Sequence, residues 1–147
     1  MAESRVRSSA AADVRLGPES SPRRGSDSLV SPFLAGWGRA FALTLAVEVP
    51  LVVALTKGTA PPFQRIALAV IANLASHPLV WFVFPELGLD YHAWLGLAEA
   101  WAVLVETFVY MTQVPALGLR RAALVSLTAN AASVAAGFVL RAASVNV

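Results

Sequence analysis

The feature that most constrains the fold is a succession of four long apolar blocks separated by short polar breaks. The blocks run from about 37 to 56, 63 to 84, 94 to 113 and 122 to 140. Each is close to the roughly 20 residues that an α-helix needs to cross the hydrocarbon core of a bilayer. In lipid only helices and closed β-barrels satisfy all backbone hydrogen bonds. These blocks are too long for barrel strands and lack the alternation of polar and apolar residues that barrel strands show. The sequence therefore predicts four transmembrane helices.

The loops between the blocks are short, so neighbouring helices are expected to run antiparallel. The predicted fold class is all-α: a four-transmembrane-helix antiparallel bundle formed by residues 35–141. The breaks between the blocks are loop one (57–62), loop two (85–93) and loop three (114–121). Loop two is expected on the side of both chain ends, opposite loops one and three. The basic residues leave the in/out orientation open, because they fall on both sides. At the end with the chain termini the basic residues are Arg39, Arg141 and those of the N-terminal tail. At the opposite end they are Lys57, Arg65 and the pair at 120–121.

The ends of the chain differ from the blocks in composition. Residues 1–34 are rich in Ser, Ala, Arg, Pro and Gly, and residues 1–32 hold five arginines and four acids. Such a segment buries too little apolar surface to fold alone, so a disordered tail is predicted. Its arginines suit contact with anionic lipid head groups, although a plain solvated tail fits equally well. Residues 142–147 are expected to form a short C-terminal tail.

Composition also excludes several classes of protein. The chain is 57% hydrophobic and only 14% charged, and it has no cysteine, which excludes disulfides and Cys-based zinc sites. The net charge of +2 is too small and too scattered to favour nucleic acid binding. Ten of the eleven basic residues are Arg and the chain is rich in Ala. That usage is associated with GC-rich bacteria, so the expected location is a bacterial inner membrane, with the lipid bilayer as first partner.

Polar residues inside the blocks recur at helical spacing, so each block is expected to carry one polar stripe. In a membrane such a stripe turns inward, away from lipid. The stripes consist of Thr44 and Glu48 in the first block, Asn73, Ser76, His77 and Trp81 in the second, Glu99, Glu106, Tyr110 and Gln113 in the third, and Ser126, Asn130, Ser133 and Gly137 in the fourth. Antiparallel helices meet at equal height near their midpoints. The mid-block members Glu48, Asn73, His77, Glu106 and Asn130 are therefore expected to converge on one layer.

The carboxylates in this layer are the main pointer to function. Asn, Ser and Thr often serve only as hydrogen-bonding contacts between membrane helices. A carboxylate at mid-span costs about 2.5 to 3.5 kcal/mol on insertion scales, so a purely structural role explains it poorly. The predicted ion- or proton-binding core is Glu48, His77 and Glu106. Its expected supporting residues are Asn73, Glu99, Tyr110 and Asn130.

The favoured interpretation is cation or metal binding, or proton-coupled transport, by a small multi-pass membrane protein. Carboxylate and imidazole suit a divalent metal such as Zn, Mn or Fe, for which the ligands would be Glu48, His77 and Glu106. The same groups suit a proton relay. One alternative is a small intramembrane hydrolase that uses Glu and His, although a non-enzymatic role is favoured. Another is a non-catalytic subunit whose polar stripes dock a larger membrane partner or a second copy of the chain.

Overall fold

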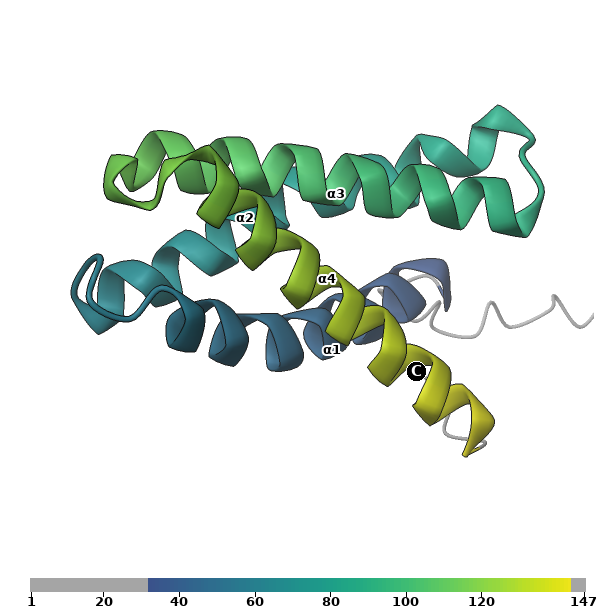
Figure 1. Cartoon of the computed structure of the whole chain (residues 1–147). Coiled ribbons are helices and arrows are strands. Elements are labelled where there is room, and N and C mark those ends of the chain that lie inside the picture. Colours follow the sequence, from purple (N-terminus) through teal and green to yellow (C-terminus); the bar gives the residue numbers. More distant parts are fainter. Residues whose placement is uncertain (1–31, 144–147) are drawn as a thin grey trace, which may run out of the picture.

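The computed structural model describes residues 32–143, and within this range all regular secondary structure is helical (Figure 1). The predicted all-α four-helix bundle is confirmed. Four long helices are joined by a tight turn and two short 3₁₀ segments. The helices are α1 (Pro32–Leu55), α2 (Pro62–Phe82), α3 (Tyr91–Gln113) and α4 (Gly118–Ala142), and the 3₁₀ segments are η1 (Phe84–Leu87) and η2 (Pro115–Leu117).

The outer surface of the described bundle is apolar. All four helices are long and apolar enough to cross a membrane. Large aliphatic and aromatic side chains such as Leu104, Phe108, Leu124 and Val139 are more than 60% exposed. Exposed apolar surface on this scale is atypical of a soluble monomer and is what contact with lipid requires.

Helix bounds depart from the predicted ones by a few residues, for local reasons. α1 begins at Pro32 rather than near 37, with proline at the first helical position, where its missing N–H costs nothing. Residues 32–34, predicted as tail, are therefore helical. α3 begins at Tyr91 rather than at 94, because the Asp90 carboxylate caps it by accepting from the backbone N–H groups of His92 (2.9 Å) and Ala93 (3.1 Å). The predictions for residues 1–31 and 144–147 lie outside the described part of the chain.

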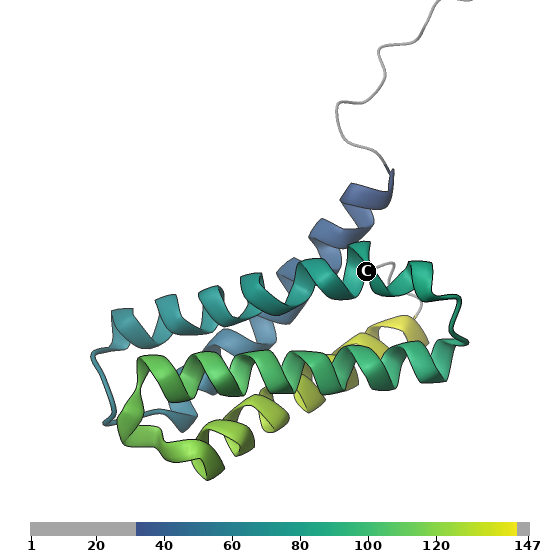
Figure 2. The same cartoon turned by 90° about the horizontal axis from the view of Figure 1, so that it is seen from above.

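The arrangement of the helices follows the antiparallel order. α1 packs against α2 and α4, and α3 packs against the same two helices. Loops one and three lie at one end of the bundle, and loop two lies at the other end with both ends of the described chain (Figure 2). α4 lies beside α3 near loop three and diverges from it toward the C-terminus (Figure 1). The two ends of the bundle are therefore packed differently.

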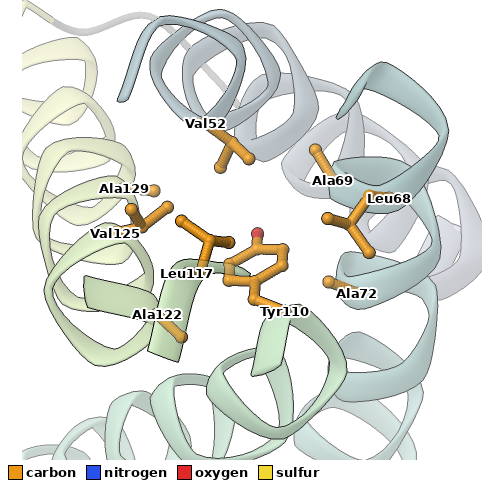
Figure 3. Packing of buried hydrophobic residues seen from close by; sticks show 9 residues of the cluster. All are labelled: Val52, Leu68, Ala69, Ala72, Tyr110, Leu117, Ala122, Val125 and Ala129. Carbon is orange, nitrogen blue, oxygen red and sulfur yellow. The ribbon is translucent and has the colours of Figure 1, made fainter. Parts of the chain in front are cut away.

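The end near loops one and three is filled by an apolar plug, a cluster of buried residues around Tyr110 (Figure 3). Tyr110 is fully buried, and its ring points across the bundle toward Val52 of α1. All four helices and η2 contribute. The members of the plug are Val52, Leu68, Ala69, Ala72, Tyr110, Leu117, Ala122, Val125 and Ala129.

Two arginines close the C-terminus of α1 at the same end. The Arg65 guanidinium, only 8% exposed, donates to the backbone oxygen of Val53. Arg121 donates to the backbone oxygen of Leu55 at 3.0 Å. The last carbonyls of a helix lack intrahelical donors and carry partial negative charge, so cations stabilise them. These side chains tie α2 and α4 to the end of α1.

Candidate functional site

Glu48 lies midway along α1 and is completely buried. Its carboxylate accepts a hydrogen bond at Oε2 from the side-chain amide of Asn73 on α2, at 3.0 Å. It accepts a second at Oε1 from the hydroxyl of Ser133 on α4, at 2.6 Å. One carboxylate therefore connects three helices.

Glu106 occupies the corresponding place on α3 and is 1% exposed. Its Oε2 accepts from the Ser126 hydroxyl at 2.9 Å and from the Asn130 amide at 2.7 Å, both on α4. Its Oε1 lies 3.4 Å from the Ser76 hydroxyl on α2, which donates to it. The second carboxylate thus also connects three helices.

The two carboxylates belong to one network, because the side chains that bind them also contact one another's backbone. The Ser133 hydroxyl, which binds Glu48, also lies 2.9 Å from the backbone oxygen of Asn130. Ser76 makes the equivalent contact with the backbone oxygen of Asn73 at 3.3 Å. We call this group the polar layer; its members are Glu48, Asn73, Ser76, Glu106, Ser126, Asn130 and Ser133.

The polar layer is electrostatically unusual, because every donor to its carboxylates within residues 32–143 is neutral. They are amides and hydroxyls, without a Lys, Arg or His among them. Glu48 and Glu106 also lie close enough to repel each other when both are ionised. Two buried negative charges without a counter-charge cost several kcal/mol or more, since the low-dielectric interior weakens solvation and strengthens repulsion. The arrangement therefore favours binding of positive charge, as a proton or as another cation.

The other predicted site residues surround this layer without joining it directly. His77 is partly buried, and its Nε2 lies 3.3 Å from the hydroxyl of Thr44, with the ring of Phe41 against it. Glu99 lies on α3 toward loop two and is partly buried. The hydroxyl of Tyr110 has no hydrogen-bond partner among residues 32–143, although it is fully buried in the apolar plug.

The structure does not assemble the predicted metal ligands Glu48, His77 and Glu106 into a three-ligand group. Within residues 32–143, no group of three or more His, Cys, Asp or Glu side chains is placed to hold a metal ion. The groups that do meet are two carboxylates with amides and hydroxyls. Among the described residues, the hydrogen-bond partner of His77 is a hydroxyl and not a carboxylate.

A cavity of about 260 Å³ leads to the polar layer from the loop-two end. Its lining extends from exposed residues at the rim, including Tyr91 and Arg141, to buried Glu48 and Asn130. His77 and Glu99 line its walls. Below the polar layer, the apolar plug fills the bundle toward loops one and three. Glu48 lines the cavity itself, and Glu106 is hydrogen-bonded to Ser76 and Asn130, which line it. The polar layer thus lies between the cavity on one side and the apolar plug on the other.

The serines of α4 take a larger part in the site than the sequence pattern predicted. The expected convergence included Glu48, Asn73, Glu106 and Asn130, and the hydrogen bonds bring these four together. Ser126 and Ser133 were expected only as contacts between helices, but each donates directly to a carboxylate. Their position on the same stripe as Asn130 was the available signal, since residues three or four apart share a helix face.

These features define a class: a small chain whose described part consists of four membrane-length helices around a buried network built on two carboxylates. No protein-family model, characterised protein or solved structure matches this chain.

Proposed function

We propose that this protein is a proton-coupled membrane transport protein, in which Glu48 and Glu106 bind the proton or the cation that exchanges with it. The observation that carries the proposal is the position of the polar layer. Two buried carboxylates from different helices belong to this layer: Glu48 lines the inner end of the cavity, and Glu106 accepts hydrogen bonds from Ser76 and Asn130, which also line it. The apolar plug lies on the other side of the layer. A site reached from one side and sealed from the other is what one state of an alternating-access transporter requires.

The chemistry of the layer supports exchange of positive charge. Hydroxyls can reverse their hydrogen bonds, so Ser76, Ser126 and Ser133 can serve a carboxylate or a carboxylic acid equally well. The Asn73 and Asn130 amides donate to one oxygen of each carboxylate. Each carboxyl group therefore keeps its place whether or not it holds a proton. Protonation alters the charge of the layer without breaking its contacts, which suits a group that must load and unload repeatedly.

The two other interpretations of the sequence receive less support. In the subunit interpretation, polar stripes would face a partner. Here Glu106 and Glu48 are buried and their hydrogen bonds lie within one chain. In the hydrolase interpretation, Glu and His would act together. Among the described residues, His77 is hydrogen-bonded to the hydroxyl of Thr44 and not to a glutamate.

The test uses the full-length protein in liposomes with an acidic, buffered interior and an enclosed pH-sensitive dye. A panel of cations, namely Na⁺, K⁺ and alkylammonium ions, is added outside. We expect at least one of them to dissipate the pH gradient faster than in protein-free liposomes. We expect Glu48→Gln and Glu106→Gln to lose this activity, because neither amide can carry the proton.

The matched control is Glu86→Gln, which changes an exposed carboxylate near loop two that lies outside the polar layer. It should behave as the wild type. Two results would overturn the proposal: wild-type rates in both polar-layer variants, or a wild-type protein that responds to no member of the panel. Size-exclusion chromatography confirms that each variant is folded.

A further inference from the structure

A groove runs along the outer surface of the bundle between α3 and α4, on the face that lipid would cover. Its lining is almost entirely aliphatic or aromatic. Three residues, Glu99, Val134 and Phe138, line both this groove and the cavity that leads to the polar layer. The remaining residues of the groove are Ala100, Val103, Leu127, Ala131 and Ala135.

The shared lining has a direct geometric meaning. If the same side chains line an internal cavity and an outer groove, those side chains are the wall between the two. This wall lies in the half of the bundle where α4 diverges from α3 (Figure 1). Val134 and Phe138 belong to α4 and Glu99 to α3. Movement of these few side chains would connect the cavity with the bilayer, and we call this place the lateral portal.

Glu99 is the unusual member of the portal. It is a partly buried carboxylate in an otherwise apolar wall, and no hydrogen bond or ion pair ties it to any other side chain in residues 32–143. A carboxylate at membrane depth without a partner is costly, so a cationic ligand is its natural complement. Behind it, the aromatic side chains of Trp81, Tyr91 and Trp94 line the cavity. Aromatic faces attract cations, ammonium groups in particular.

A basic side chain lies at the aqueous rim of the cavity. Arg141, in the last turn of α4, is exposed and lines the cavity there. A positive charge disfavours a second cation beside it. Among the residues that line the cavity, the basic group therefore lies at the aqueous rim and the carboxylate of Glu99 at the portal.

We infer that the lateral portal admits an amphipathic ammonium compound from the bilayer, with its cationic head in the cavity beside Glu99 and its alkyl chain in the α3–α4 groove. The charge of Glu99 selects the head, and the apolar groove selects the chain. The inference deepens the proposed function, because it names the class of cation that reaches the Glu48–Glu106 site, but binding at the portal does not depend on transport.

The experiment measures binding to full-length protein in phosphatidylcholine nanodiscs, without any ion gradient. The probe is benzyldimethyloctylammonium, and binding is followed by the fluorescence of the tryptophans, two of which line the cavity. We expect saturable binding, weakened about tenfold or more in Glu99→Gln, as loss of a charge-assisted contact implies. Tetramethylammonium, which has no chain, should bind much more weakly than the probe.

A second pair of variants tests the route. Ala131→Phe fills the groove from its exposed wall, whereas Ala42→Phe places the same ring on an exposed position of α1 outside the groove. Neither position is buried, so both variants should fold. We expect Ala131→Phe to slow probe association at least several-fold and Ala42→Phe to leave it unchanged.

Three results would each overturn the lateral portal: equal probe affinity in Glu99→Gln and the wild type, equal association in the two Phe variants, or tetramethylammonium binding as tightly as the probe. Because no gradient is present, this outcome is independent of the liposome test. Proton exchange in liposomes together with weakened probe binding in Glu99→Gln supports both proposals. Normal binding by the portal variants overturns only the lateral portal, and absence of proton exchange overturns only the proposed function.

Discussion

Replacement of Glu106 by glutamine or by alanine separates the charge of the polar layer from its hydrogen bonds. The native carboxylate accepts hydrogen bonds from Ser126 and Asn130 at Oε2 and from Ser76 at Oε1. In Glu106→Gln, the amide oxygen takes the place of Oε2 and keeps both donors. The amide nitrogen takes the place of Oε1 and faces the Ser76 hydroxyl, which can accept. The geometry thus allows glutamine in one orientation without loss of a contact.

The expected magnitudes differ clearly. Glu106→Ala removes three hydrogen bonds and leaves buried donors without a partner. At about 0.5 to 1.5 kcal/mol each, this destabilises the protein by roughly 2 to 4 kcal/mol. Glu106→Gln should change stability by less than about 1 kcal/mol if the native group carries a proton. If the native group is ionised, removal of a mid-membrane charge should stabilise the protein by up to about 3 kcal/mol.

The assay is reversible unfolding in mixed micelles by increasing SDS fraction, followed by circular dichroism. The control pair is Glu86→Gln and Glu86→Ala, whose side chain is exposed, and both should match the wild type. If Glu106→Gln destabilises the protein as much as Glu106→Ala, the reasoning is refuted. That result would mean that the negative charge itself holds the layer together.

Three further predictions follow from other parts of the molecule. Tyr110→Phe removes a buried hydroxyl that has no partner in the described structure, so it should leave stability unchanged or raise it by about 1 kcal/mol in the same SDS titration; a marked loss would show that the hydroxyl is bonded. Arg65→Met removes one of the two cations at the end of α1 and should lower the free energy of unfolding by about 1 to 2 kcal/mol. Lys57→Gln, at an exposed position, should leave it almost unchanged, and equal effects of the two variants would contradict the capping role. Single cysteines can replace the exposed residues Lys57, Asp90 and Leu119. A membrane-impermeant thiol reagent should label positions 57 and 119 from one side of the membrane and position 90 from the other. Labelling of 57 and 90 from the same side would refute the four-span topology.

The fold was predictable because its determinants are local. The length of each apolar block specifies a membrane-crossing helix, and the short breaks between blocks specify antiparallel neighbours. The helical spacing of the polar residues also predicted the inward faces of the helices, except at the end of α3, where Gln113 is exposed. Glu48 and Glu106 meet the same α4 stripe because each lies near the middle of its helix, where antiparallel helices share a height.

The contacts that depend on rotation about the helix axes were not predictable. Spacing placed His77 and Glu48 on inward faces, but it does not specify whether two inward side chains on different helices meet. In the structure, His77 contacts Thr44, and Ser133 takes the place beside Glu48. The cap at Asp90 was not predicted, because it lies four residues before Trp94, the first residue of the predicted apolar block.

The shape of the bundle also depends on side-chain volume in a way that a polarity pattern does not reveal. Near loops one and three, α2 and α4 face the centre with alanines such as Ala69, Ala72 and Ala129, which allow close packing. Alanine has no side-chain rotamers, so these positions of the plug cannot open by side-chain rotation. We therefore expect access to the polar layer from that end to require displacement of whole helices, together with movement of the larger side chains of the plug, the Tyr110 ring among them. At the opposite end, the wall between cavity and bilayer is made of side chains that can rotate. The two ends of the bundle therefore differ in what must move to open them, and helix displacement at the plug is the step that the proposed transport cycle must include.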